Sequence, residues 1–159
     1  MRQMIREANA SDYEVMDEVF RASAKAFCSR SYDSQVIESW AGEPSPDRLL
    51  RNKESGDELY VFTIDGSVVC FGSINLEDHK LVSLFVSPEQ SGKGIGQSML
   101  EFLVARVKSS GTPALKVDSS LNAVSFHRRH GFTEISRSMY RTQNGVDMAS
   151  VQMERKLCL

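Results

Sequence analysis

The stretch VSPEQSGKGIGQSML, from Val86 to Leu100, combines three features in a short length of chain. The aliphatic run LVSLFV leads into it and indicates a strand, and Gly92, Gly94 and Gly96 then occupy alternate positions. An amphipathic helical pattern begins directly afterwards. Unpaired backbone N–H groups at the start of a helix lie in a positive partial field and bind phosphate when no side chain blocks the approach. The stretch therefore predicts a strand, a phosphate-binding loop and a helix.

Two familiar phosphate-binding loops do not match this one. A P-loop places a serine or threonine directly after its Gly-Lys pair, whereas Gly94 follows Lys93 here. A dinucleotide-binding loop belongs to a βαβ unit near the start of a parallel sheet, whereas this loop follows a predicted antiparallel meander. A nucleotide-phosphate enzyme is thus an alternative supported by the glycines alone.

Length and composition limit the classes of protein to consider. The 159 residues predict one domain over residues 1–159, and 41% hydrophobic and 25% charged residues are ordinary for a globular protein. A formal net charge of -2 offers no general field for a polyanion, so nucleic acid is not expected as a partner. The sequence shows neither a signal core nor the apolar run of ~20 residues that a membrane span needs, so we expect a cytoplasmic protein without membrane insertion. The three cysteines are widely spaced, and no metal site or disulfide framework is indicated.

The N-terminal third is predicted to be mostly helical. A short strand, MIRE, comes first, and Ser11 with Glu14 has the spacing of a capping box before a helix over residues 12–28. YDSQVIESWAG predicts a second helix, capped by Asp33 or the serine after it. The Ser-Pro pair that follows indicates a further helical turn over residues 46–50.

From residue 58 the period of the sequence changes to that of strands. ELYVFTI and SVVCFGSINL flank an Asp-Gly turn and predict an antiparallel hairpin, with LVSLFV as the third strand of the meander. ALKVD is separated from LVSLFV by the helix, so the two strands are expected to be parallel neighbours joined by a right-handed crossover. A helix follows that is capped by Ser119 or Ser120 and ended by Gly131, and a final hairpin of residues 132–142 and 148–157 completes the chain.

The stretch LVSLFVSPEQSGKGIGQSML, with NAVSFHRRHGF about thirty residues later, resembles the GNAT superfamily of acyl-CoA-dependent N-acyltransferases. The order of predicted elements is similar over most of the chain. The resemblance implies an α+β fold in which helices flank a central mixed, mostly antiparallel sheet with a splayed pair of parallel strands. It also implies an N-acetyltransferase that uses acetyl-CoA and no metal, with direct attack by a primary amine of a small molecule or peptide.

The resemblance also implies a set of CoA-binding residues. In the family the pattern Gln/Arg-x-x-Gly-x-Gly/Ala wraps the pyrophosphate, and Ser91, Gly94 and Gly96 occupy those positions here, so that a serine replaces the usual long polar side chain. Main-chain groups of the strand before the loop would bind the pantetheine arm and the oxyanion. The implied residues are Leu84, Phe85, Val86, Ser91, Gly92, Lys93, Gly94, Ile95, Gly96, Gln97, Ser98, Asn122, Phe126 and His127.

Acid and base candidates follow from the same resemblance. His127 stands where the family has a tyrosine that protonates the leaving thiolate; an ordinary histidine, with a pKa near ~6.5, is protonated only in part at neutral pH. A solvated helix histidine is the alternative, and Tyr140 is a lower-ranked acid. Glu77 and Asp78 lie near the start of the third meander strand, where the family often has its base. A charged hairpin turn would explain them equally well.

The acceptor pocket is expected between the N-terminal helices and the end of the parallel strand. The candidate acceptor-binding residues are Tyr32 and Trp40 from the helical segment and Asp118 and Ser119 from the strand. For Trp40, packing in the core is the alternative. The acceptor itself stays open among polyamines, amino acids, antibiotics, and peptide or protein amines. A non-catalytic acyl-CoA-binding module is the competing hypothesis, because a serine and a histidine replace two expected residues. Edge strands near the C-terminus favour a homodimer.

Overall fold

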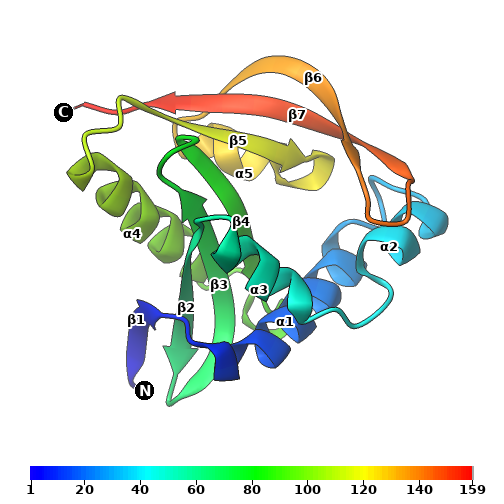
Figure 1. Ribbon diagram of the computed structural model, residues 1–159, viewed down its shortest axis with the longest axis horizontal. Helices are drawn as coiled ribbons and strands as arrows, with labels where there is room; N and C mark the ends of the chain where they lie inside the picture. Colours follow the sequence, from blue (N-terminus) through cyan, green and yellow to red (C-terminus); the bar gives the residue numbers. More distant parts are fainter. Residues whose placement is uncertain (159) are drawn as a thin grey trace.

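The computed structural model describes residues 1–158, and within them seven strands form one mixed sheet in the order β1-β2-β3-β4-β5-β7-β6 (Figure 1). All neighbouring strands are antiparallel except β4 and β5, which are parallel as predicted. The strands are β1 (Gln3–Glu7), β2 (Glu58–Ile64), β3 (Ser67–Asn75), β4 (Lys80–Val86), β5 (Ala114–Ser120), β6 (Thr133–Arg141) and β7 (Asp147–Lys156).

The helices cover the two faces of this sheet. Against one face, α4 packs in a core with residues of β2, β3, β4, β5 and β7, while α1, α2 and α3 form a second core against the other face. The α-helices are α1 (Tyr13–Phe27), α2 (Ser34–Ala41), α3 (Asp47–Glu54), α4 (Ile95–Ser109) and α5 (Val124–Arg129), and the short 3-10 helices are η1 (Ala10–Asp12), η2 (Pro88–Gln90) and η3 (Leu121–Ala123). Among the described residues, no helix is both long and apolar enough to cross a membrane.

The β2–β3 hairpin follows from its turn residues. Asp65 and Gly66 have φ of 49° and 85°, the left-handed conformation that a tight Asp-Gly hairpin turn requires. The predicted helix cap at Asp33 is also confirmed, since its carboxylate accepts the Val36 N–H at 3.0 Å.

Three predicted details of the helices differ in the structure. The capping box is Asn9 with Asp12 rather than Ser11 with Glu14, because the chain first makes the turn η1, in which Asn9 accepts the Ser11 N–H at 3.1 Å. Helix α3 is longer than the single turn expected and runs to Glu54. The helix expected after a cap at Ser119 or Ser120 begins with the 3-10 turn η3, whose N-cap is Ser120, and becomes α-helical only at Val124; Ser119 is not the cap because β5 continues to Ser120 in register with β7.

Candidate active site

The parallel strands β4 and β5 separate almost as soon as they meet. Within the described residues they pair at two positions, Lys80 with Lys116 and Leu81 with Val117, although β4 continues to Val86. Beyond this point each strand is held only by its antiparallel neighbour, β3 or β7. The carboxyl ends of β4 and β5 therefore diverge and open a gap in the sheet (Figure 1).

The backbone of β4 faces this gap at alternate residues. Ser87 donates its N–H to the carbonyl of Val69 on the β3 side at 2.8 Å. Bonded and non-bonded pairs alternate along an antiparallel register, so Phe85 also turns its N–H and C=O toward β3. The same groups of Leu84 and Val86 then point away from β3, into the gap. They form an open strand edge that can bind an extended ligand.

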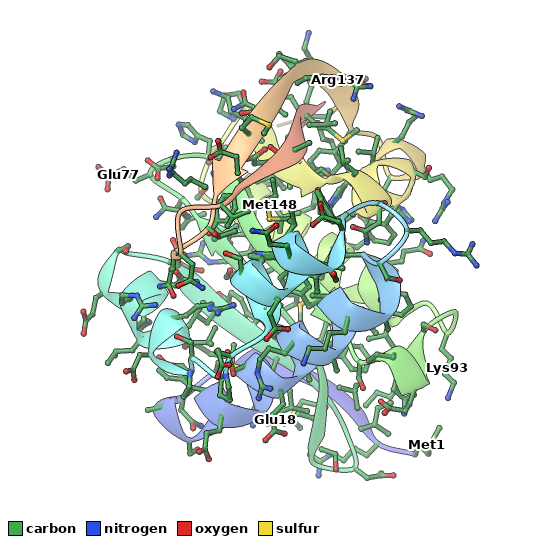
Figure 2. All side chains as sticks on the ribbon, turned by 90° about the vertical axis from the view of Figure 1, so that its right-hand side faces the viewer. Met1, Glu18, Glu77, Lys93, Arg137 and Met148 are labelled. Atoms are coloured by element: carbon green, nitrogen blue, oxygen red, sulfur yellow. The ribbon has the colours of Figure 1, made fainter. Side chains whose placement is uncertain are left out.

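The glycine loop follows β4 directly. Gly92 and Gly94 have φ of 76° and 78°, and a Cβ at either position would meet no atom within 4 Å, so the backbone conformation rather than space requires glycine. Gly94 precedes α4 and makes no side-chain cap, which leaves the first N–H groups of the helix available to an anion. Between the two glycines, Lys93 projects from the edge of the molecule (Figure 2).

Gly96 brings three elements together at the end of the gap. A Cβ on this residue would lie 3.4 Å from Cγ2 of Val86 on β4 and 3.6 Å from Cε1 of Phe126 on α5. Three residues that the sequence assigned to CoA binding therefore come from distant parts of the chain and lie side by side.

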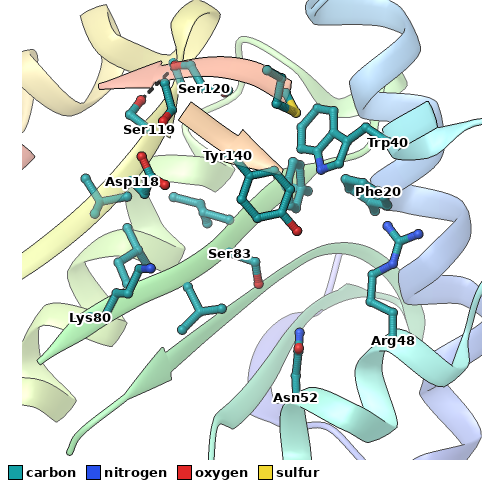
Figure 3. Close-up of a pocket in the computed structure, with 18 of the residues that line it drawn as sticks. Phe20, Trp40, Arg48, Asn52, Lys80, Ser83, Asp118, Ser119, Ser120 and Tyr140 are labelled. Atoms are coloured by element: carbon teal, nitrogen blue, oxygen red, sulfur yellow. Dashed lines mark hydrogen bonds between the residues drawn. The ribbon is translucent and has the colours of Figure 1, made fainter. Parts of the chain in front are cut away.

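A cavity of about 320 Å³ lies beside the gap and extends toward the N-terminal helices (Figure 3). Its volume is in the range of small-molecule sites. It brings together eight of the residues considered for the site, namely Tyr32, Trp40, Leu84, Phe85, Asp118, Ser119, His127 and Tyr140.

Comparison with known proteins identifies this arrangement. Residues 28–157 match the family described as the acetyltransferase (GNAT) domain. The chain belongs to the GNAT family. An uncharacterized N-acetyltransferase of Escherichia coli K12, YafP, is 27% identical over 133 residues, which cover 84% of this chain and 83% of that protein. The protein is thus a GNAT-type N-acetyltransferase.

Solved structures show the same fold. A GCN5-related N-acetyltransferase from Rhodopseudomonas palustris superposes with a TM-score of 0.90 at 24% identity, over 99% of this chain and 97% of that one. PaiA N-acetyltransferase from Thermoplasma acidophilum, in complex with coenzyme A, has a TM-score of 0.80 at 24% identity, over 99% of this chain and 100% of its own. The predicted α+β GNAT fold, with its splayed parallel pair, is confirmed.

His127 in this GNAT chain is buried, with 5% of its surface exposed, and not solvated. Its ring lies 5.4 Å from that of Phe126 and 5.2 Å from that of Phe132, and its Nδ1 has no hydrogen-bond partner. Burial, with a smaller contribution from His130, lowers the pKa of His127 to about 4. The imidazole is therefore neutral at neutral pH, which argues against the proton-donor role expected from the sequence.

Glu77 and Asp78 do not reach the cavity. They lie with exposed side chains in the turn between β3 and β4, where the Asp78 N–H donates to Oδ1 of Asn75 at 2.9 Å. Glu77 projects from the surface (Figure 2). The geometry matches the charged-turn alternative better than the role of general base.

Asp118 is the carboxylate that the cavity does contain. It follows the short β4–β5 pairing on β5 and points into the cavity (Figure 3), and its Oδ1 is buried without a hydrogen-bond partner. Among the described residues that line the cavity, it is the only aspartate or glutamate. The next residue, Ser119, is turned to the backbone, since its hydroxyl donates to the Ser120 carbonyl at 2.8 Å.

The predicted acceptor residues Tyr32 and Trp40 also line the cavity. Tyr32 donates its hydroxyl to the Ala149 carbonyl and accepts the Leu121 N–H at 2.9 Å, so the hydroxyl is engaged and the ring lines the cavity. Burial raises the pKa of this phenol. Trp40 packs edge-on against Phe20, with centroids 5.0 Å apart, and has both a packing role and a cavity surface.

The predicted CoA-binding residue Asn122 contacts Cys28, a residue from the N-terminal part of the chain. The Cys28 thiol lies 3.1 Å from Oδ1 of Asn122, and burial raises the pKa of that thiol to about 11. The thiol therefore keeps its proton and can donate it to the amide oxygen.

Several cavity residues escaped the sequence analysis. Arg48, Arg51 and Asn52 come from α3, and Lys80 comes from the start of β4. The spacing of Arg48 and Asn52, four residues apart, would have placed them on one helix face, but only if the helix had been recognised beyond its first turn.

Proposed function

We propose that the protein transfers the acetyl group of acetyl-CoA to a primary amine of a small molecule by direct attack in a ternary complex. The observation that carries this proposal is the open backbone edge of β4, where Leu84 and Val86 face a gap that adjoins a cavity containing one carboxylate.

The residues around the gap fit acetyl-CoA. The free N–H groups at the start of α4 suit the pyrophosphate, and the open edge of β4 suits the pantetheine arm, bound as an added strand. An N–H of Leu84 or Val86 would stabilise the negative charge that develops on the thioester oxygen. The relative PaiA, solved with coenzyme A, shares this fold.

Asp118 is the proposed proton acceptor. An amine attacks only in its neutral form. As its nitrogen bonds to the acetyl carbon it becomes positively charged, and the Asp118 carboxylate takes the proton that the nitrogen loses, either directly or through a water. The C–S bond then breaks and the electron pair leaves on sulfur. A thiol of cysteine-like pKa, near ~8.5, is a competent leaving group, so water can supply its proton and His127 serves as part of the cavity wall.

Acetyl-CoA binding is tested by thermal unfolding. A ligand held at ~100 times its dissociation constant adds about 2.7 kcal/mol to the free energy of unfolding, which is an easily measured rise in melting temperature. The absence of a rise with either CoA or acetyl-CoA would rule out the proposed binding site.

The base is tested by thiol release with a panel of amines. Asp118→Asn should lower kcat/KM by about 10²-fold to 10⁴-fold at neutral pH, because it removes the proton acceptor, while the melting-temperature rise with acetyl-CoA is kept. Asp78→Asn is the matched control, because this carboxylate lies outside the cavity, and it should keep full activity. Equal activities in the two variants would remove Asp118 from the mechanism.

A further inference from the structure

The side chains that line the cavity carry more positive than negative charge. Arg48, Arg51 and Lys80 line it, against Asp118 alone on the negative side, and His127 adds no charge at neutral pH. Such a lining repels polyamines and other multiply charged cations and attracts anions.

Arg48 carries this argument furthest because it is half-buried and unpaired. Its guanidinium carbon lies 4.3 Å from the centroid of the Phe20 ring, and within residues 1–158 the guanidinium group makes neither an ion pair nor a hydrogen bond. Asp17 is the carboxylate whose charge acts on Arg48, but its Oδ2 accepts Arg21 Nε at 2.9 Å and the Ser45 N–H at 3.1 Å, and its buried Oδ1 makes no hydrogen bond or ion pair with the guanidinium within residues 1–158. The guanidinium therefore keeps all its donors for a ligand.

Other arginines of this chain show what a structural role looks like. Arg6 is bound to Asp12 at 2.8 Å, Arg21 to Asp17 at 2.9 Å and Arg106 to Glu58 at 2.8 Å. A partly desolvated cation without such a partner costs free energy, and an anionic ligand removes that cost. The stacking on Phe20 holds the planar group in place beforehand, which suits a carboxylate.

The cavity is polarised along its length. Figure 3 shows Asp118 on the β5 side and Arg48 with Asn52 on the α3 side, with the ring of Tyr140 between them. Lys80 lies on the same side as Asp118. A substrate whose amine approaches Asp118 would direct its remaining groups toward Arg48.

We propose that the acceptor is an amine that also carries a carboxylate, such as an amino acid, and that Arg48 binds that carboxylate. This inference rests on the proposed acetyl transfer. It narrows the acceptor to zwitterionic small molecules and makes Arg48 the residue that determines specificity.

The test compares acceptors that differ only in this charge. Thiol release from acetyl-CoA is measured with the proteinogenic L-amino acids and β-alanine, each against its carboxamide. The amine of an amide loses its proton more readily than that of the acid, so intrinsic reactivity favours the amide. We expect the opposite order, with kcat/KM higher for at least one acid than for its amide by about tenfold to a hundredfold, as a charge-assisted contact predicts.

Arg48→Gln then identifies the residue responsible. It should raise KM for the preferred acid by about the same factor with little change in kcat, because the carboxylate is bound equally in ground and transition states. The amide should be almost unaffected. Arg137→Gln is the control, since Arg137 is exposed on β6 outside the cavity and projects from the surface (Figure 2).

A second measurement detects binding, so that it also applies if the true acceptor is acetylated only slowly. In the presence of CoA, N-acetylated amino acids should raise the melting temperature of the wild type more than their amides do, and Arg48→Gln should abolish the difference. An enzyme that acetylates amides or polyamines in preference to acids overturns the inference but leaves the proposed acetyl transfer intact. A protein that binds acetyl-CoA but neither uses nor binds any of these carboxylates also overturns it. Failure to bind acetyl-CoA at all would be a failure of the proposed function, and the inference falls with it.

Discussion

His127 shows how the surroundings of one side chain decide its chemistry. Its neighbours in sequence, HRRHG, indicate an exposed basic helix end, and nothing in that segment reveals that Phe126 and Phe132 enclose the ring. For Asp118, the structure supports a catalytic role that the sequence did not favour. The sequence placed it at the acceptor pocket but offered no reason to rank it above Glu77 or Asp78 as the base. These carboxylates differ in how deeply their side chains are buried and in whether they point into the cavity, and tertiary contacts determine both properties.

The buried His127 should make stability depend on pH. Its pKa is about 4 in the folded protein and near the ordinary ~6.5 when unfolded. Above pH 6.5 both states are neutral and the residue has no effect. As the pH falls toward 4 the unfolded state binds the proton first, so the free energy of unfolding decreases with a slope approaching about 1.4 kcal/mol per pH unit. Urea unfolding from pH 7.5 to 4.5 gives the free energy of unfolding of the wild type and of His127→Phe. The difference between the two free energies should change with pH by this slope.

Carboxylates titrate in both proteins and cancel in that difference. Parallel profiles would mean that His127 is not held neutral. At pH 7.5 the same variant should keep turnover within about tenfold of wild type, because a neutral imidazole contributes no general acid. A loss of a hundredfold or more would restore the proton-donor role.

At the scale of elements, the sequence predicted most of what matters for the fold. Strand and helix order, the Asp-Gly hairpin and the parallel β4–β5 pair are confirmed because each follows from local periodicity or turn chemistry. The helix starts were less predictable, since the continuation of β5 to Ser120 depends on pairing with β7, a contact between residues distant in sequence. Close packing of α4 on β3 was not predicted at all, although it fixes the helix whose first turn faces the gap.

This packing depends on Gly72. A Cβ at that position would lie 2.7 Å from Cδ1 of Leu103 and 3.1 Å from Cγ of Met99, both on α4. Gly72→Ala should therefore lower the free energy of unfolding by about 1–3 kcal/mol through overpacking. The control is Gly96→Ala, where the new methyl meets Val86 at 3.4 Å and φ is not positive, so stability should change little. The two variants are compared by urea unfolding without CoA. Equal stability would contradict the conclusion that α4 packs closely on Gly72.

At the scale of the whole molecule, the cavity exists because the N-terminal helices meet the C-terminal hairpin. Side-chain contacts across that junction include Tyr32 with Ala149 and Leu121, and the hydroxyls of Ser39 and Thr142, 2.7 Å apart. The charged side chains of the cavity also come from separate elements, α3, β4 and β5. The sequence alone therefore could not show whether the pocket is acidic or basic. A resemblance to a family predicts the fold and the CoA side, whereas the acceptor side depends on which side chains these separate elements bring together.

Tyr32 is the residue through which this assembly can be tested. Tyr32→Phe leaves the Leu121 N–H and the Ala149 carbonyl without their partner, which should lower the free energy of unfolding by about 1–3 kcal/mol. The control is Tyr60→Phe, whose hydroxyl donates to Glu58 on the same strand at 2.7 Å and lies outside the junction between the N-terminal helices and the C-terminal hairpin. Because the junction carries the acceptor wall, Tyr32→Phe should also raise KM for the amine several-fold, with the melting-temperature rise on adding CoA preserved. If both variants lose similar stability and neither changes KM, the Tyr32 bridge does not hold the acceptor wall in place.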